Sequence, residues 1–232
     1  MTVAQTTKNR NMTNASTTGA FFVIDGTDGS GKATQTRKLV DRLILEGHDV
    51  ETISFPQYGK KSAGALEDYL GGKYGKNAMH VNARATSILF AVDRFDASFQ
   101  IREWLEQGKT VISDRYVGSN MGHQGGKIKD PIARSEYLAW NDELEHGIFN
   151  IPRPTLNIIL SVSTEVASKM AAKGATEKTK VAGDIHESDP EHLRASIETY
   201  RELATTFPGF HLIDCAPTGE PRSIDDIHEE IW

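Results

Sequence analysis

The chain has 232 residues, 38% of them hydrophobic and 25% charged, and its formal net charge at pH 7 is −6. This length suits one α/β domain with a hydrophobic core, and the negative charge argues against a nucleic-acid polymer as partner, because such partners require a basic surface. The single cysteine excludes an internal disulfide, which is compatible with a reducing cytoplasm, and no run of residues is long and apolar enough to span a membrane.

Residues 1–19 form a polar leader that contains many threonines and asparagines and no acidic residue. Because they lack the apolar stretch of a signal peptide, we expect a disordered tail ahead of a single domain over residues 20–232. An organelle-targeting peptide is the alternative, since such peptides are also poor in acidic residues and rich in hydroxyls.

The most informative segment follows an apolar run that predicts the first strand, at 20–25. Residues 26–33 read Gly-Thr-Asp-Gly-Ser-Gly-Lys-Ala, which is typical of a P-loop, where backbone N–H groups, a helix N-terminus and a lysine hold phosphates. The pattern requires Ser or Thr after Lys32, but the chain has Ala33 there. We therefore expect a nucleoside triphosphate site, with a turn that binds nothing as the alternative. The expected ATP-binding residues are Gly26, Thr27, Asp28, Gly29, Ser30, Gly31, Lys32, Ala33 and Thr34.

The remaining elements alternate between strands and helices. Strands that alternate with helices form a parallel sheet with both faces covered, so the predicted fold is α/β, a three-layer αβα sandwich of the P-loop NTPase type with a five-stranded parallel sheet. Further strands are expected at about 49–54, 110–113, 155–162 and 210–214, and helices at about 31–46, 62–70, 82–107, 131–146, 164–172, 190–205 and after Ser223.

Three segments carry further expectations. A glycine-rich loop is expected from Gly118 to Gly126, and the lysine-rich, weakly apolar residues 173–188 predict a mobile lid. In the long helix at 82–107, apolar residues recur at the spacing of a buried stripe. The residues of this stripe are Ile88, Val92, Phe95 and Phe99.

A second polar motif is expected beside the P-loop. The strand at 110–113 leads directly into Asp114 and Arg115, and ligands of parallel sheets bind beyond the carboxyl ends of the strands. Arg115 offers planar donors to a phosphate and Asp114 could hold Mg²⁺, with an ion pair at the sheet rim as the alternative. Asp28, close to the bound phosphates, could hold a sugar 3′-hydroxyl or a magnesium-bound water.

Two groups of residues could recognise a base. Phe90 and Arg94 lie four residues apart on the long helix, so a ring and a guanidinium share one face, although they could also be ordinary core and surface residues. Asn120, His123 and Gln124 would also share a face if their segment were helical, and amide groups can read a pyrimidine edge. A single histidine in such a place is more often structural than catalytic.

From about residue 20 to the C-terminus the chain resembles the thymidylate kinase family, P-loop enzymes that make dTDP from dTMP and ATP. The resemblance lies in Asp-Gly-Thr-Asp-Gly-Ser-Gly-Lys at 25–32, Leu-Phe-Ala-Val-Asp-Arg at 89–94 and Asp-Arg-Tyr-Val-Gly-Ser-Asn at 114–120, which His-Gln-Gly continues at 123–125. Asp-Ile-His-Glu at 184–187 resembles the acidic motif after the family's lid, and Tyr-Arg-Glu-Leu-Ala at 200–204 resembles the helix beyond it.

The resemblance implies transfer of the γ-phosphoryl group of MgATP to dTMP, for dTTP synthesis, in a cytoplasmic enzyme that pairs as a homodimer. Phe90 would stack on thymine, Arg94 would bond its O4, and Arg115 would bridge the phosphates. The implied catalytic residues are Lys32, Asp28, Arg115, Lys178 and Lys180. The implied dTMP-binding residues are Phe55, Gln57, Phe90, Arg94, Arg115, Ser119, Asn120, His123 and Gln124, and the implied metal-binding residues are Asp28, Asp114 and Glu187.

The chain also departs from the family pattern. Gln57 stands where the family has an arginine for the 5′-phosphate of dTMP, and His123 replaces a usual tyrosine beside the deoxyribose. Because Gly29 leaves the P-loop without an arginine, a lid lysine would have to supply the cation for the transition state. These departures keep two alternatives open, a kinase for another nucleoside monophosphate and a nucleotide-binding regulator without turnover.

Overall fold

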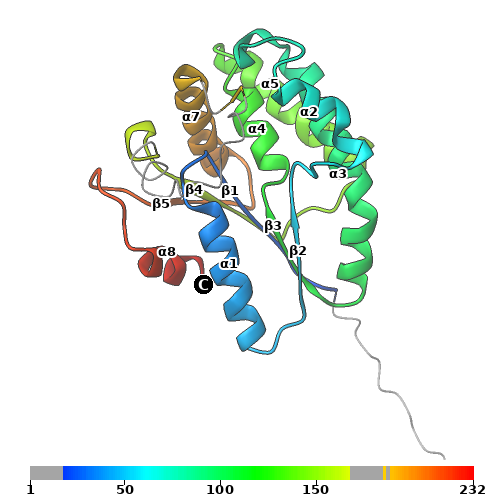
Figure 1. Cartoon of the computed structure of the whole chain (residues 1–232), viewed down its shortest axis with the longest axis vertical. Coiled ribbons are helices and arrows are strands. Elements are labelled where there is room, and N and C mark those ends of the chain that lie inside the picture. Colours follow the sequence, from blue (N-terminus) through cyan, green and yellow to red (C-terminus); the bar gives the residue numbers. More distant parts are fainter. Residues whose placement is uncertain (1–17, 168–184, 187–188) are drawn as a thin grey trace, which may run out of the picture.

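The computed structural model describes residues 18–167, 185–186 and 189–232, and it is built around one sheet of five parallel strands (Figure 1). The order of the strands across the sheet is β2-β3-β1-β4-β5. The predicted α/β sandwich with a five-stranded parallel sheet is therefore confirmed. The strands are β1 (Phe21–Gly26), β2 (Val50–Ser54), β3 (Thr110–Asp114), β4 (Leu156–Ser161) and β5 (Phe210–Asp214).

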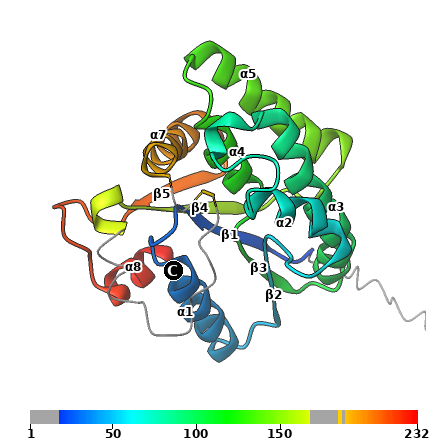
Figure 2. The same ribbon diagram turned by 45° about the horizontal axis from the view of Figure 1, so that its top comes forward.

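Helices cover both faces of the sheet (Figure 2). Helices α1 (Lys32–Leu45) and α8 (Ile224–Ile231) lie on one face, and the remaining long helices lie on the other. The second face carries α3 (Ala83–Glu106), α4 (Val117–Gly125), α5 (Pro131–Asp142) and α7 (Pro190–Thr206), with α2 (Gly64–Leu70) beyond α3. Short turns of helix occur at η1 (Lys61–Ala63), η2 (Ala78–His80) and η3 (Glu143–Ile148).

The two faces of the sheet hold two separate apolar cores. Phe21 and Val23 of β1 pack in the core beneath α3, α4, α5 and α7, whereas Ile24 packs in the core that Leu39 and Ile227 of α1 and α8 complete. Because neighbouring side chains of a strand point to opposite faces, one short apolar strand serves both cores. The carboxyl ends of β1 and β3 are thereby fixed side by side at one edge of the sheet.

Several helix starts follow the capping chemistry of the sequence. The side chains of Asp130, Asp189 and Ser223 accept hydrogen bonds from backbone N–H groups in the first turns of α5, α7 and α8. Proline at the first position of α5 and α7 suits a site that needs no N–H donor. The expected helix at 131–146 divides into α5 and the π-helical turn η3, and the one at 62–70 begins with the 3₁₀ turn η1.

The glycine-rich segment at 118–126 is not the expected loop, because residues Val117–Gly125 form helix α4, which is buried along its whole length. Its glycines let it lie unusually close to α7. A Cβ atom on Gly122 would lie 2.6 Å from the ring of Tyr200, and one on Gly126 would lie 2.9 Å from the backbone of Ala195. Close packing between helices, rather than a turn, explains the glycines.

The expected burial of the apolar stripe on α3 is also wrong. Ile88, Val92, Phe95 and Phe99 are 40–61% exposed. The face of α3 that is buried is mostly small or polar, with Ser87, Ala91, Arg94, Ala97 and Ser98 among its residues. Polar groups of the site occupy the inner face, so the apolar stripe is left outside.

No helix among the described residues is both long and apolar enough to cross a membrane. Residues 1–17 of the expected tail lie outside the described residues, and so do residues 173–184 and 187–188 of the expected lid. Lys178, Lys180 and Glu187 lie outside them as well.

Candidate active site

The P-loop forms the turn between β1 and α1, and its shape depends on glycine. Gly26 and Gly29 have φ angles of 134° and 77°, which L side chains rarely adopt. A Cβ atom on Gly26 would also lie 2.4 Å from the carbonyl oxygen of Leu160, and one on Gly29 would lie 2.7 Å from that of Ala167. The chain can therefore turn tightly enough to present backbone N–H groups to an anion.

Two hydroxyl groups of the P-loop lack partners. The side-chain oxygens of Thr27 and Ser30 are buried, and neither has a hydrogen-bond partner in the part of the chain that the structure describes. A buried hydroxyl without a partner is unfavourable, so two of them in one loop point to a ligand that binds there. Phosphate oxygens would satisfy both.

Lys32 opens α1 and lies inside the loop. Its Nζ donates to the carbonyl oxygen of Thr27 at 2.8 Å and lies 3.6 Å from Asp28 Oδ1. Burial, together with the charge of Arg115, lowers the pKa of Lys32 to about 8, so the ammonium form is still the main form at neutral pH. A phosphate brought to this lysine would meet a cation that is already desolvated.

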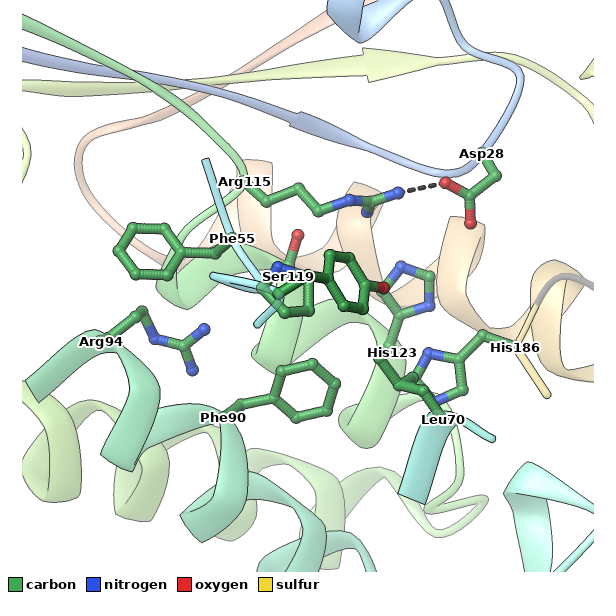
Figure 3. A pocket seen from close by; sticks show the side chains of 11 residues that line it. Asp28, Phe55, Leu70, Phe90, Arg94, Arg115, Ser119, His123 and His186 are labelled. Carbon is green, nitrogen blue, oxygen red and sulfur yellow. Dashed lines mark hydrogen bonds and ion pairs between the residues drawn. The ribbon is translucent and has the colours of Figure 1, made fainter. Parts of the chain in front are cut away.

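Arg115 joins the rim of the sheet to the P-loop (Figure 3). It follows β3 with a left-handed backbone, φ 68°, and its guanidinium donates to Asp28 Oδ1 and to the carbonyl oxygen of Gly26. Burial alone would raise the pKa of Asp28, but the charges of Arg115 and Lys32 outweigh it and hold that pKa below its usual value. The expectation that the two motifs meet at one edge is confirmed.

Asp114 lies at the mouth of the same groove, which Lys32, Ala33, Thr34 and Arg115 also line. Burial raises its pKa, with Lys32 and Arg115 acting in the opposite direction. A carboxylate whose charged form is disfavoured by burial is stabilised by an added cation. Asp28 already has Arg115 as a partner, so Asp114 is the freer of the two predicted metal ligands that the structure describes.

A second pocket adjoins the rim and shares Asp28 and Arg115 with it. Figure 3 shows the ring of Phe90 and the guanidinium of Arg94 beside each other in this pocket, with Ser119 and His123 further along its wall. The predicted base-binding pair therefore does share one face of α3 and does face a cavity. The complete lining is Asp28, Phe55, Pro56, Tyr58, Leu70, Phe90, Arg94, Arg115, Ser119, His123 and His186.

A buried ion pair holds Arg94 in place. Its Nε donates to Glu145 Oε2 at 2.5 Å and its Nη2 to Glu145 Oε1 at 2.7 Å, and both side chains are at most 1% exposed. The side-chain amides of Asn120 and Asn141 also donate to Glu145, at 3.0 and 3.2 Å. This network fixes the plane of the guanidinium and leaves Nη1 unbonded to Glu145, available for a ligand.

Another network lies beneath the P-loop. Asp25 Oδ1 accepts hydrogen bonds from Ser119 Oγ at 2.6 Å, from the hydroxyl of Tyr200 at 2.9 Å and from the backbone N–H of Gly26 at 3.0 Å. The carboxylate therefore ties the first residue of the loop to helices α4 and α7. Ser119, expected at the base, contributes here as well as to the pocket wall.

The other predicted residues lie around these two pockets. Asn120 is buried behind Arg94, and neither amide atom of the buried Gln124 has a partner among the described residues. Phe55 lines both pockets and packs against Tyr116, with ring centroids 5.6 Å apart. The side chain of Gln57 instead lines a neighbouring groove together with Lys60. The backbone N–H of Gln57 donates a hydrogen bond to Asp93 Oδ2 at 2.8 Å.

Sequence reasoning missed two residues that organise the pocket. Glu145 is one of several acidic residues in its helix, and nothing in its spacing separates it from exposed neighbours. His186 lies within the acidic motif at 184–187, but its ring packs against that of Phe90, with centroids 6.2 Å apart and planes 26° apart. An imidazole thus lies close to the ring on which a base was expected to stack.

Comparisons with known proteins agree with one another. The family model described as thymidylate kinase matches residues 24–231. The thymidylate kinase of Mycobacterium tuberculosis is 34% identical over 185 residues, which is 79% of this chain and 85% of that protein. The human thymidylate kinase is 28% identical over 213 residues, 92% of this chain and 88% of that protein.

The fold has a counterpart among solved structures. The thymidylate kinase of Candida albicans, which is described as having a broad substrate specificity, superposes with a TM-score of 0.72 over 93% of this chain and 90% of that one. At 21% identity this similarity concerns the fold.

Proposed function

Because the chain belongs to the thymidylate kinase family, we infer that it transfers the γ-phosphoryl group of ATP to dTMP, giving dTDP and ADP for dTTP synthesis. The observation that carries this inference is the shared wall of the two pockets, in which Asp28 and Arg115 lie between the P-loop and the pair formed by Phe90 and Arg94. A donor held by the loop and an acceptor held by that pair would meet tail to tail over the rim.

In this assignment the acceptor base stacks on Phe90 and Arg94 Nη1 donates to its O4 oxygen. The arrangement of Arg94 supports the role, because Glu145 takes two of the three guanidinium nitrogens and orients the third. Asn120, Gln124, Ser119, His123, Phe55 and Gln57 complete the proposed dTMP site. Among the described residues, the side-chain amide atoms of Gln124 and the Oδ1 atom of Asn120 have no hydrogen-bond partner, as expected of groups that bind a ligand or water.

The proposed chemistry is a direct, in-line phosphoryl transfer. The acceptor phosphate is already nucleophilic near neutral pH, so the protein needs to position two anions and offset their charge rather than supply a general base. Lys32 and Arg115 are placed for this task, with Lys178 or Lys180 of the proposed lid over 173–188 as a further cation. Closure of such a lid would also exclude water and limit ATP hydrolysis.

We also propose Mg²⁺ as cofactor. Asp114 offers a half-buried carboxylate in the wall of the phosphate groove. Asp28 already pairs with Arg115, and Ala33 has no side-chain oxygen, so Asp114 is the main candidate for direct coordination among the described residues. Thr34, one residue beyond Ala33, supplies the nearest hydroxyl along the chain, and Glu187 is the proposed third carboxylate. When bound, the ion would neutralise charge on the phosphates of ATP.

The exposed stripe on α3 supports a homodimer as the working form. We also propose that the enzyme acts in the cytoplasm. Ile88, Val92, Phe95 and Phe99 form an apolar surface on one helix, and such surfaces mark association sites more often than free surface. A cytoplasmic location is consistent with ATP as donor and with the single thiol, Cys215, which is buried and free. Residues 1–19 are proposed as a tail outside the domain.

A second candidate function is a kinase for another nucleoside monophosphate. Gln57 and His123 are the residues that motivate it, because both stand where the family pattern has other residues. The test is one coupled assay of ADP release with dTMP, dUMP, dGMP and dCMP as acceptors, and with Lys32→Ala as the inactive reference. We expect the highest kcat/KM with dTMP; a higher value with another acceptor would replace the assignment, and ATP binding without ADP release for every acceptor would indicate a regulator.

A further inference from the structure

Three histidines from separate parts of the chain meet beside the acceptor pocket. His123 belongs to α4, His192 to α7, and His186 lies in the described pair of residues 185–186. Their ring centroids are 4.6–5.4 Å apart, and one nitrogen from each ring lies within 4.8 Å of the others. Among residues 18–167, 185–186 and 189–232, these three side chains form the one group of at least three His, Cys, Asp or Glu residues close enough to hold a metal ion.

Burial makes the cluster unusual. The three residues are 5%, 5% and 0% exposed, in the order His123, His186 and His192. The pKa of each lies below its usual value, mainly because of burial, and that of His192 falls to about 4. Burial of all three side chains favours the neutral imidazole, which is the form that binds a metal ion.

One nitrogen in the cluster has no use within the protein. His192 Nδ1 is buried and has no hydrogen-bond partner among the described residues. Its Nε2 lies 3.3 Å from His123 Nδ1, and Ser196 Oγ lies 3.3 Å from the same atom of His123. The nitrogens that face each other are therefore Nε2 of His192 and Nδ1 of His123, and an ion between the two rings would bind these atoms while Nδ1 of His192 keeps the ring proton.

The spacing of the nitrogens suits a transition-metal ion. With Zn–N distances of about 2.0–2.1 Å, two nitrogens on a tetrahedral ion lie about 3.3 Å apart, and the His123–His192 pair already has this separation. The rings are inclined by 15–37° to one another, so His186 would have to rotate to complete the set. Its Nε2 lies 2.8 Å from the hydroxyl of Tyr69, which can orient a ligating ring from behind.

We propose that His123, His186 and His192 form a binding site for a divalent transition-metal ion of the zinc type, with a fourth ligand supplied by water or by an oxygen in the acceptor pocket. Imidazole suits Zn²⁺, Co²⁺ and Ni²⁺, whereas Mg²⁺ prefers oxygen ligands, so the site is distinct from the proposed magnesium site. A bound ion would join the chain just before residue 187 to helices α4 and α7.

The surrounding charges set the expected affinity. Lys32, Lys127 and Arg115 act on His123 as positive charges, and Asp28 is the carboxylate that acts on both His186 and His192. Asp189 is a second carboxylate that acts on His192. Because the three cations still outnumber the two carboxylates, the ion should bind reversibly and more weakly than a structural zinc ion held by thiolates. Metal binding can be measured without nucleotides, so its test does not depend on the proposed kinase activity.

The test is a titration of the purified full chain with Co²⁺, in which the visible absorption of the bound Co²⁺ is measured after each addition. The chain is first treated with a chelator, and excess Mg²⁺ is kept present so that sites with oxygen ligands are occupied. We expect saturation at one Co²⁺ per chain and loss of the signal when Zn²⁺ is added. Absence of a saturable signal would overturn the proposal.

Two single variants make the result specific. His192→Gln should weaken Co²⁺ binding at least tenfold, because it removes the imidazole whose Nε2 lies 3.3 Å from His123 Nδ1. His211→Gln, a change at an exposed histidine of β5, should leave binding unchanged. Both variants are checked for folding by thermal melts without metal. Zn²⁺ should then raise the melting temperature of the wild type and of His211→Gln, but not that of His192→Gln. Equal binding by His192→Gln and wild type, with both folded, would also overturn the proposal.

Discussion

The phosphate rim, which is the P-loop together with Asp114 and Arg115 at the end of β3, shares Asp28 and Arg115 with the acceptor pocket. The two regions are nevertheless built in different ways. The rim is mainly one continuous turn, residues 26–34, whose backbone is bent by glycines. The pocket takes its walls from α2, α3 and α4 and from several connecting segments, and its key cation is held by a buried carboxylate on η3. The first region depends on backbone shape, and the second depends on a set of buried charges that must all be present.

The largest expected effect comes from breaking the buried pair of the pocket. Glu145→Leu leaves the guanidinium of Arg94 buried without its partner, which should lower the free energy of unfolding by about 3–5 kcal/mol. Urea denaturation measures this change. The double variant Arg94→Met with Glu145→Leu should regain most of the stability, because no unpaired charge remains, but should bind dTMP poorly. A Glu145→Leu variant with the urea midpoint of the wild type would show that the pocket does not depend on this pair.

The next largest effect is expected in the rim and concerns turnover rather than folding. Lys32→Ala removes a desolvated cation from the phosphate groove, and we expect kcat to fall by at least about 10²-fold. The matched control is Lys38→Ala on the same helix, where the lysine pairs with Asp225 at the surface. Steady-state assays of ADP release compare the two. If Lys32→Ala kept more than a tenth of the wild-type rate, the role of this lysine would be wrong.

A smaller effect should follow from a change in the spacing of α4 and α7, which carry part of the pocket wall. In Gly122→Ala the new methyl group would lie 2.6 Å from the ring of Tyr200, and overpacking of this kind costs about 1–3 kcal/mol. Gly64→Ala is the control, because a Cβ atom there meets nothing within 4 Å. Thermal or urea unfolding gives both values, and equal stabilities would mean that the helices can separate without loss.

The smallest effect on the folded chain is expected on the outer face of α3, opposite to Arg94. Phe99 is 61% exposed, so Phe99→Ser should change the free energy of unfolding of a single chain by no more than about 0.5 kcal/mol. The same change should shift the mass measured by light scattering from dimer to monomer at low micromolar concentration. Retention of the dimer would place the subunit contact elsewhere.

The comparison of the two regions also explains what the sequence could predict. The P-loop was recognised because its function depends on consecutive residues, and the five strands because each is a short apolar run between breaks. Asp114 and Arg115 could be placed next to the loop because parallel strands end at one edge. The starts of the helices at 131, at 190 and after Ser223 could be predicted because helix capping by Asp130, Asp189 and Ser223 is local chemistry.

The errors and omissions have the opposite origin. Glu145 could not be distinguished from exposed acids, since its role depends on a partner 51 residues away. The glycines of α4 suggested a loop because their purpose, contact with Tyr200, lies on another helix. The stripe on α3 was expected inside because apolar spacing identifies a face but not which way that face turns. Such properties belong to the assembled fold.

Asp25 has a consequence for the kinetics of the enzyme. It bonds the first residue of the donor loop and, through Ser119 and Tyr200, two helices that border the acceptor side. A substitution that removes the acceptor of these bonds, such as Asp25→Ala, should therefore raise the Michaelis constants of ATP and dTMP together in the folded enzyme. Residues that serve one nucleotide would alter one constant and spare the other.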